Sequence, residues 1–389
     1  MGNYDEKDKK IHELLNREKM YKSQIERLED KVAFYNEPIL VGLNNIDACS
    51  YMNATLQCLL NTKKLTEYFL NNFKNNDPKK IMANEYYEVV LNLCKKENNK
   101  KSYSPFSFKE KLSKENPLFE GIGAHDSKDL INFLIEKLHQ ELNVVNKNNT
   151  NNNCDDKVIN YTDKKEVFRS FAKGLASNFN SPISLFFYAI LESKTGCLSC
   201  KKVEYNFQIY NFLEFPLEKV NQYLCEKDKN RQLVLPNGKN HDVKLDDCFE
   251  YFGRDELMKG DNKMHCNYCD KLCTKVYSTK IFSFPNYLII NLNRGKDGEY
   301  ECDVNFPDML DVSKYASFKQ GCKIYELYAV ICHIGPSSMI GHFVAYCKNR
   351  IDNQWYLYND ALVAICTKPF QYNEGKPYIL FYKSSSGGF

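Results

Sequence analysis

Two CxxC pairs limit the fold of this 389-residue chain more than any other feature of its sequence. Cys197 and Cys200 form the first pair, and Cys266 and Cys269 form the second. Each spacing lets two thiolates bind one metal ion from a single tight turn, and two such turns provide the four sulfur ligands of a tetrahedral structural zinc site. The fold must therefore bring two turns that are distant in sequence together, and Zn²⁺ is the expected cofactor.

Strand-like runs flank the two pairs, at residues 203–217 and 275–294. They favour a zinc-binding ribbon over a set of unmetallated cysteines. His265 and Cys273 lie close enough to the second pair to replace one of the four ligands. Zinc ribbons also occur in nucleic-acid-binding proteins, but the basic stripe that such binding needs is not evident in this sequence.

The composition is that of a soluble globular chain, with 43% hydrophobic and 26% charged residues. Its length gives room for two or three domains. The formal charge of +3, from 53 basic and 50 acidic residues, is too balanced to predict binding to nucleic acid or to a membrane. The sequence has 16 cysteines, but four are at metal-binding spacing and we find neither a signal peptide nor a bilayer-spanning apolar run. We therefore expect a reducing compartment, the cytoplasm or the nucleus.

Residues 42–57 read as a loop that leads into an amphipathic helix. A residue at a helix N-terminus beside an imidazolium is well placed to be a reactive thiolate, because the helix macrodipole favours the negative charge. Position 50 fits this place, but it is a serine, whose hydroxyl such a site activates poorly. The only thiol nearby belongs to Cys49, one residue earlier, and a rotation of roughly 100° about the helix axis would separate the two side chains.

Residues 325–348 read as two strands joined by a turn that contains Gly335, Pro336 and Gly341. A further strand is expected over residues 355–363. The alternating apolar residues on the first two strands are Leu327, Ala329 and Ile331, then Phe343 and Ala345. A sheet built from these strands would hold His342, Asn359 and Asp360 close to the C-terminal end of the chain.

Several motifs in residues 38–383 resemble those of the ubiquitin-specific proteases and occur in the same order. Residues 42–57 are similar to the family's Cys box, in which Tyr-Met-Asn follows the nucleophile directly. Gly341-His342-Phe343-Val344-Ala345-Tyr346 is similar to its His box, and Trp355-Tyr-Leu-Tyr-Asn-Asp360 to the segment that follows. The remaining matches are the helix at residues 124–142 and the strand segment at residues 280–294.

The resemblance implies a role for each site residue. Ser50 occupies the nucleophile position, His342 the general base and Asn359 the residue that orients the base imidazole. Asp360 is the adjacent polar residue, and the Asn45 amide would donate a hydrogen bond to the oxyanion. A single side-chain amide in that role contributes about 3–4 kcal/mol to transition-state stabilisation.

Residues 124–142 are expected to form a helix with an acidic start. In the family, a carboxylate at the start of this helix helps to receive the extended C-terminal tail of ubiquitin. Asp126 and Asp129 match the acidic positions, whereas Ala124, His125 and Leu130 depart from the family pattern. An amphipathic core helix with an ordinary acidic N-cap is the plainer interpretation.

The fold class implied is α+β, a papain-like cysteine-protease fold with a thumb, a palm and zinc-ribbon fingers, preceded by an N-terminal helix. The expected boundaries are 1–37 for the charged helical or coiled-coil segment and 38–383 for the catalytic domain, followed by a flexible tail at 384–389. Within that domain we expect the thumb at about 38–185, the fingers at about 186–290 and the palm at about 288–383.

The family reaction is thiol-dependent hydrolysis of the peptide or isopeptide bond after the last glycine of ubiquitin. Because Ser50 fills the nucleophile position, the sequence predicts a ubiquitin-binding pseudo-deubiquitinase with weak or absent hydrolysis. Two alternatives keep the activity: catalysis through Cys49, or Ser50 as an engineered replacement of cysteine. In a further alternative, both ubiquitin binding and catalysis are lost and only an interaction module remains.

Residues 1–37 carry a heptad pattern that steps by three and four without a break. Its members are Ile11, Leu14, Glu18, Tyr21, Ile25, Leu28, Val32 and Tyr35. The pattern predicts either a coiled coil with a partner or a solitary helix packed on the catalytic domain, and association is the favoured interpretation.

Overall fold

The structure is a computed structural model. It describes residues 17, 19–22, 25, 28, 34–94, 101–144, 159–295, 300–318, 323–337, 340–366 and 375–385. The Asn-rich segment at residues 146–156, expected to be a solvated loop, lies outside the described residues, as does much of the heptad segment. None of the described helices is long and apolar enough to span a membrane.

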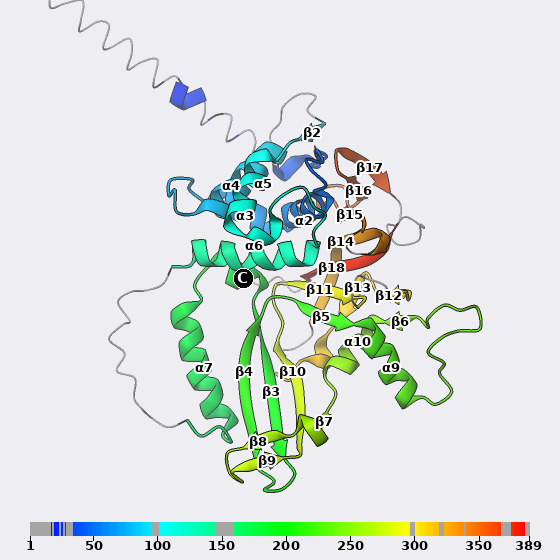
Figure 1. The fold of residues 1–389 in the computed structure, drawn as a ribbon. Helices are drawn as coiled ribbons and strands as arrows, with labels where there is room; N and C mark the ends of the chain where they lie inside the picture. Colours follow the sequence, from blue (N-terminus) through cyan, green and yellow to red (C-terminus); the bar gives the residue numbers. More distant parts are fainter. Residues whose placement is uncertain are drawn as a thin grey trace, which may run out of the picture.

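A layer of helices forms the upper part of the molecule in Figure 1. It contains α2 (Ser50–Leu60), α3 (Lys63–Asn71), α4 (Ile81–Cys94), α5 (Phe106–Glu115), α6 (Ser127–Leu142) and α8 (Pro182–Phe187), with the 3₁₀ turn η1 (Pro117–Phe119). Every residue of α2 is buried, so this helix is the centre of the layer. A short parallel pair, β1 (Gly42–Leu43) with β2 (Ser102–Tyr103), leads the chain into it.

An eight-stranded sheet packs beside this layer, in the order β17-β16-β15-β14-β18-β11-β5, with β13 paired to β14. Its strands are β5 (Leu213–Pro216), β11 (Tyr287–Asn293), β13 (Met309–Asp311), β14 (Ile324–Ser337), β15 (Ile340–Lys348), β16 (Trp355–Asn359), β17 (Leu362–Cys366) and β18 (Lys376–Ser384). Both faces of the central strands are buried, which explains their continuous apolar runs. On β18, Ile379 and Phe381 face the helical layer, whereas Leu380 and Tyr382 face a second core on the opposite side of the sheet.

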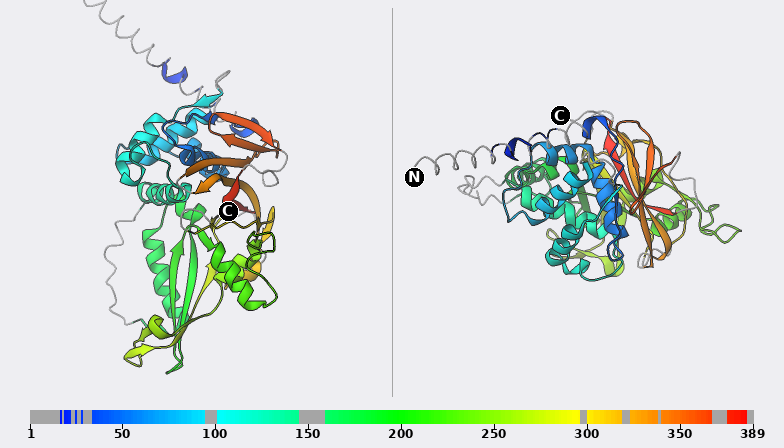
Figure 2. Two further views of the ribbon diagram at one scale, coloured as in Figure 1. Left: turned by 45° about the vertical axis from the view of Figure 1, so that its right-hand side comes forward. Right: turned by 90° about the horizontal axis from the view of Figure 1, so that it is seen from above.

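A four-stranded sheet extends away from this body, in the order β4-β3-β10-β7 (Figure 1). Its strands are β3 (Ala189–Cys197), β4 (Val203–Tyr210), β7 (Glu256–Met258) and β10 (Lys275–Ser283), and α7 (Lys164–Asn178) lies against β4. The hairpin of β8 (Met264–Cys266) and β9 (Lys271–Cys273) lies at the end remote from the helical layer in both side views (Figure 2). The long insertion between β5 and β7 forms α9 (Leu217–Lys227), β6 (Val243–Lys244) and α10 (Leu245–Phe252). The smaller elements are η3 (Gly260–Asn262), β12 (Val304–Asn305) and η5 (Ser313–Tyr315).

The expected α+β fold class is confirmed, and most expected elements are present. Helix α6 begins after Asp126, as its acidic start predicts. Two expectations were wrong: Gly335, Pro336 and Gly341, expected in a turn, lie within β14 and β15, and residues 355–363 are not a single strand. The chain turns back at Asp360, whose φ of 51° lies in the left-handed region, and residues 362–366 form the separate strand β17. Aspartate tolerates this conformation better than most residues, so the turn had a weak sequence signal.

Candidate active site and candidate metal centre

A tight loop brings the chain to the start of α2. Ser50 is the first residue of the helix, and Cys49 is its N-cap. The loop places two non-glycine residues in succession, Asp47 and Ala48, in the left-handed region with φ of 62° and 53°. The side-chain oxygen Oδ1 of Asn45 stabilises this turn by accepting a hydrogen bond from the Cys49 N–H at 2.9 Å. The predicted oxyanion residue therefore also shapes the loop that presents position 50.

The Cys49 thiol points into this loop. Its side chain has no exposed surface, and its sulfur accepts a hydrogen bond from the Ile46 N–H at 3.2 Å. Burial is the largest of the effects that raise the pKa of the Cys49 thiol to about 11. A neutral, enclosed thiol at neutral pH is a poor nucleophile.

The Ser50 hydroxyl faces the strand that carries the candidate base. Its Oγ accepts a hydrogen bond from the Phe343 N–H at 3.2 Å, so Ser50 contacts the residue directly after His342 on β15. Ser50 is 6% exposed. In the part of the chain that the structure describes, no hydrogen bond joins the Ser50 hydroxyl to the His342 ring.

His342 and Asn359 form the pair that the sequence motifs predict. The distance from His342 Nε2 to Asn359 Oδ1 is 2.7 Å, across the neighbouring strands β15 and β16. Because the amide oxygen only accepts hydrogen bonds, Nε2 must carry the proton, which leaves Nδ1 as the nitrogen with a free lone pair. The arrangement therefore prepares the imidazole to act as a base through Nδ1.

Asp360 joins the three parts of the site. One carboxylate oxygen accepts a hydrogen bond from Asn45 Nδ2 at 2.8 Å, and the other accepts from Asn53 Nδ2 at 2.8 Å. The first oxygen is also 3.9 Å from His342 Nε2. Asn53 was not among the predicted site residues, although it is the Asn of the Tyr-Met-Asn motif and follows Ser50 by almost one helical turn.

Asp126 and Asp129 lie at the N-terminus of α6. Asp126 caps the helix by accepting a hydrogen bond from the Lys128 N–H at 2.8 Å, and it also accepts one from the Tyr378 hydroxyl at 2.5 Å. Burial, and next the Asp126 charge, raise the pKa of the Asp129 carboxyl above its usual range. A hydrogen bond of 3.2 Å from Ser127 Oγ to the Tyr51 carbonyl connects this helix end to α2.

The four predicted cysteines come together at the remote end of the four-stranded sheet. Their sulfur atoms all lie within 4.8 Å of one another. The distances from Cys197 Sγ to Cys269 Sγ and from Cys200 Sγ to Cys266 Sγ are 4.0 and 3.7 Å. Four sulfurs around a tetrahedral zinc at its usual Zn–S distance would be about 3.8 Å apart, so the group fits this ion.

The two alternative ligands lie differently around this cluster. Cys273 is buried beside it, whereas the exposed His265 lies 3.5 Å from Asp270. Hydrogen bonds from the backbone N–H groups of Cys200 and Ser199 lower the pKa of the Cys197 thiol, whereas burial raises that of the Cys269 thiol. The described residues thus contain one four-cysteine group that could hold a metal ion.

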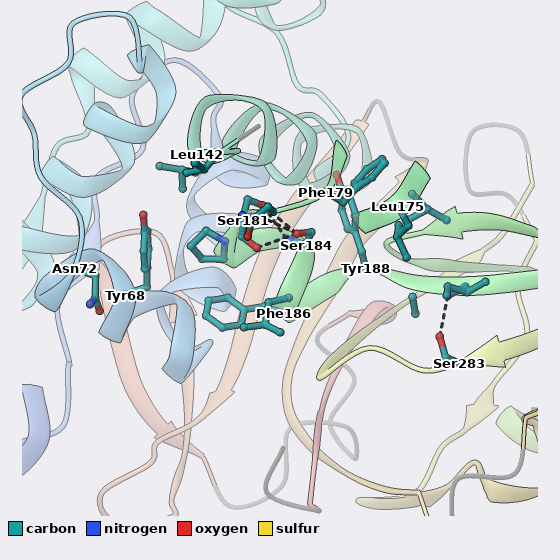
Figure 3. Close-up of a pocket in the computed structure, with 17 residues that line it drawn as sticks. Tyr68, Asn72, Leu142, Leu175, Phe179, Ser181, Ser184, Phe186, Tyr188 and Ser283 are labelled. Carbon is teal, nitrogen blue, oxygen red and sulfur yellow. Dashed lines mark hydrogen bonds between the residues drawn. The ribbon is translucent and has the colours of Figure 1, made fainter. Parts of the chain in front are cut away.

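A separate cleft of about 730 Å³ opens where α3, α6, α7, α8 and β3 meet (Figure 3). Its walls are mostly apolar, including Leu142, Phe179, Phe186 and Tyr188, and none of the predicted site residues lines it. The cleft is therefore distinct from the site around Ser50.

A family model described as ubiquitin carboxyl-terminal hydrolase matches residues 41–382, which include the whole of this site. The chain belongs to the ubiquitin carboxyl-terminal hydrolase family. This membership explains why the residues around Ser50, His342 and Asn359 converge, and it agrees with the motifs that resemble ubiquitin-specific proteases.

Curated members of the hydrolase family are similar along most of this chain. Ubiquitin carboxyl-terminal hydrolase 2 from Bos taurus is 28% identical over 364 residues, which cover 89% of this chain and 55% of that protein. Ubiquitin carboxyl-terminal hydrolase 21 from Mus musculus is 26% identical over 367 residues, which cover 88% and 61%. The chain thus spans about half the length of the curated relatives it matches.

Solved structures share the fold. The Ubp8 DUB module of SAGA, with Sgf11, Sus1 and Sgf73 and bound to ubiquitin aldehyde, contains a chain that matches with a TM-score of 0.62 and 22% identity. The match covers 89% of this hydrolase-family chain and 69% of the other. A second structure of that module, with a substituted Ubp8 and bound to monoubiquitin, matches with a TM-score of 0.60 and 20% identity. The predicted catalytic-domain fold of the ubiquitin-specific proteases is thereby confirmed.

Proposed function

We propose that this chain is a ubiquitin-binding pseudo-deubiquitinase, which recognises ubiquitin through its C-terminal Gly-Gly tail and hydrolyses its conjugates weakly or not at all. The observation that carries the proposal is the serine at the first position of α2, beside a prepared imidazole–amide pair. Family membership and the ubiquitin-bound forms of proteins with the same fold support ubiquitin as the ligand.

The tail would run between the start of α6 and His342 and end beside Ser50. Asp129 supports this path because its carboxylate is partly exposed, and because burial and, to a lesser extent, repulsion by the Asp126 charge raise its pKa. A cationic group of an incoming tail would relieve this repulsion. Tyr378 holds Asp126 in place, and the hydrogen bond between Ser127 and Tyr51 keeps this recognition region in register with position 50.

Weak hydrolysis follows from the chemistry of the two groups nearest the scissile bond. A serine hydroxyl has a far higher pKa than a thiol, and a site that depends on a thiolate–imidazolium pair activates it poorly. The packing of Cys49 argues against the alternative route, since that thiol is enclosed and neutral. The remaining parts of the family mechanism, the Asn45 amide and the His342–Asn359 pair, are present.

An active cysteine-type deubiquitinase is the second candidate function, with Ser50 standing where a natural cysteine would be. The intact pair of His342 and Asn359 favours it, because this pair would serve a thiol at position 50 without rearrangement. Both functions require the same ubiquitin-binding surface, so they differ only in the atom at the end of one side chain.

A ubiquitin probe with a thiol-reactive C-terminus separates these functions. We expect the chain with Ser50 to form no covalent adduct, and the Ser50→Cys variant to form one at position 50. The double variant with Ser50→Cys and His342→Ala serves as the control and should react at least tenfold more slowly, because the thiol loses its base. An adduct at Cys49 of the unmodified chain would overturn the pseudoenzyme assignment.

Calorimetry with free ubiquitin tests recognition separately from chemistry. We expect binding by the unmodified chain and weaker binding, by at least tenfold, after Asp129→Lys. Lys79→Glu, an exposed change between α3 and α4, is the matched control that should leave the affinity unchanged. If a folded sample does not bind ubiquitin, the chain has only a role as an interaction module.

The four-cysteine group would hold a structural zinc ion through Cys197, Cys200, Cys266 and Cys269. The ion would fix the tip of the four-stranded sheet and would take no part in chemistry at Ser50. The N-terminal segment at residues 1–37 would serve as an association helix, and the chain would act in the cytoplasm or the nucleus.

A further inference from the structure

The cleft where α3, α6, α7, α8 and β3 meet has no role in the proposed function. Its volume of about 730 Å³ is in the range of small-molecule binding sites, which is roughly 300–1,000 Å³. The described residues that line it include neither the groups around Ser50 nor the four cysteines. The cleft is therefore a candidate for a binding site of its own.

The walls of this cleft are uncharged. Its lining consists of 17 described residues, and none of them is an aspartate, glutamate, lysine, arginine or histidine. His139 supports the wall from behind, with Nδ1 at 2.7 Å from Ser181 Oγ, and burial lowers the pKa of this imidazole, so that it is neutral at physiological pH. A charged group of a ligand would lose its hydration here without gaining a partner. The cleft therefore disfavours charged ligands.

Aromatic side chains line the cleft from more than one direction. Figure 3 shows Tyr68 on one side of the turn at Ser181 and Ser184, and Phe179 and Tyr188 on the other. Aromatic rings gain energy from offset stacking or edge-to-face contact with other rings, beyond the apolar area that they bury. A ligand with planar rings would therefore match these walls better than a flexible chain.

Two hydroxyl groups of the lining have no protein partner. Among the residues that the structure describes, neither the Tyr68 nor the Tyr188 hydroxyl forms a hydrogen bond. Tyr287, whose ring contacts that of Phe186, lies outside the lining and does have a partner, because its hydroxyl accepts a hydrogen bond from the Lys64 N–H at 3.1 Å. A tyrosine hydroxyl can donate or accept, so the two unpaired groups could orient a polar atom of a ligand.

The wall formed by α8 is held in place without a ligand. The Ser184 N–H donates to Ser181 Oγ at 3.0 Å and the Ser181 N–H donates to Ser184 Oγ at 3.1 Å, which together form a capping box at the start of the helix. Further along, Asn286 Nδ2 donates to the Leu185 carbonyl at 2.9 Å. Because this wall is already ordered, binding would cost little conformational entropy there.

The nearest segment of the chain in sequence does not suit this cleft as an occupant. Val144 and Leu185 line the cleft and are 64 and 61% exposed, so they form part of its mouth. The Asn-rich segment at residues 146–156 follows Val144, but its sequence contains no large apolar side chain. An apolar occupant must therefore come from elsewhere.

We propose that this cleft binds an uncharged aromatic small molecule, with at least two rings and one polar atom that forms a hydrogen bond with Tyr68 or Tyr188. The molecule would pack between the helical layer, which contributes α3, α6 and α8, and the four-stranded sheet, which contributes β3. This inference goes beyond the proposed function and does not depend on ubiquitin binding.

Two fluorescent probes with the same rings provide the test. Phenylnaphthylamine is uncharged and becomes brighter in apolar sites, whereas anilinonaphthalene sulfonate has the same ring system with one added sulfonate. We expect the full chain to bind the uncharged probe saturably and at least tenfold more tightly than the sulfonate, because the cleft offers no partner for the charge. Equal affinity for the two probes, or no saturable binding of the uncharged one, would contradict the proposal.

Variants assign the binding to the cleft. Leu185→Glu puts a carboxylate at the mouth and should weaken binding of phenylnaphthylamine at least tenfold, whereas Leu257→Glu, at an exposed leucine of β7, should leave it unchanged. The double change Tyr68→Phe and Tyr188→Phe should weaken it roughly three- to tenfold, through loss of the hydrogen bond. Melting temperatures without probe identify any variant that has not folded. Probe binding that folded cleft variants leave unchanged would place the probe elsewhere and overturn the proposal.

Sedimentation of the full chain without probe tests whether a second copy of the chain fills the cleft instead. We expect the unmodified chain and the Leu185→Glu variant to sediment alike, because the cleft is then free for a small molecule in both. A dimer that Leu185→Glu dissociates would overturn the proposal and identify the second copy as the occupant.

Discussion

At the residue scale, the site depends on which of two neighbouring side chains faces β15. Ser50 does, because the helix begins there and its hydroxyl accepts the Phe343 N–H. Cys49 is turned into the preceding loop, where the Ile46 N–H and the Asn45 amide oxygen surround its sulfur. Two consecutive residues therefore have opposite orientations: the Ser50 side chain faces the site, and the Cys49 side chain is enclosed in the loop.

This orientation predicts the reactivity of the Cys49 thiol. Since the pKa of the thiol rises from 9.0 to about 11, only about 0.1% of it is thiolate at pH 8. We expect iodoacetamide at pH 8 to leave Cys49 unmodified in the folded chain, while the less buried Cys225 reacts. Mass spectrometry of peptides after timed alkylation measures both residues.

The pH dependence has a defined sign. The pKa of the Cys49 thiol is higher in the folded chain than its ordinary value, so folding favours the neutral thiol. The contribution of this thiol to the free energy of unfolding is therefore complete below about pH 9 and is lost as the pH rises toward 11. Alkylation of Cys49 should accelerate over the same range. Rapid alkylation of Cys49 at pH 8 without unfolding would mean that the thiol is accessible. Catalysis through Cys49 would then again be a candidate mechanism.

At the element scale, the site requires that β1 pass very close to the turn between β16 and β17. A Cβ atom at Gly42 would lie 2.4 Å from the Ala361 carbonyl oxygen, and the Leu43 N–H donates a hydrogen bond of 2.9 Å to the Asp360 carbonyl. This contact holds the loop that begins at Asn44 against Asp360. Glycine at position 42 is thus a steric requirement.

We predict opposite effects for two Gly→Ala substitutions. Gly42→Ala should lower the free energy of unfolding by about 1–3 kcal/mol, because backbone must move to admit the methyl group. Gly174→Ala, within α7 and with nothing within 4 Å of the added carbon, should raise it by about 0.5–1 kcal/mol through helix propensity. Urea unfolding of both variants is the measurement, and equal stability of the two would refute the close approach at β1.

The elements were more predictable than the connections between them. Alternating or continuous apolar runs predicted β11, β14, β15 and β18, because burial on one or both faces determines those residues directly. The turn at Asp360 had no glycine or proline to mark it, so the sequence pattern continued through it. The role of Asn53 depends on a hydrogen bond to a residue 307 positions away, and a single sequence contains no record of such a distance.

At the scale of the whole molecule, a few strands connect the helical layer, the eight-stranded sheet and the four-stranded sheet. Strand β3 runs from the helical layer to the cysteine group, and β10 returns beside it before the chain re-enters the eight-stranded sheet, which already contains β5, through β11. The site around Ser50 lies at one end of this path and the four cysteines at the other. Under the proposed function, the ribbon tip would contribute to recognition of ubiquitin, and any chemistry at Ser50 would be separate from it.

Removal of the metal tests this division between recognition and chemistry. We expect about one zinc ion per chain by elemental analysis, and loss of the ion after Cys266→Ser, with Cys225→Ser as the control that keeps it. Because the tip has little core beyond the cysteines themselves, the zinc-free protein should unfold locally at β8 and β9 and bind ubiquitin more weakly.

Labelling of the Ser50→Cys variant by a small thiol reagent without ubiquitin should continue at its original rate after zinc removal, since α2 and β15 belong to a different core. A fully folded tip without zinc would contradict the structural role, and a loss of small-reagent labelling would mean that the two ends are coupled.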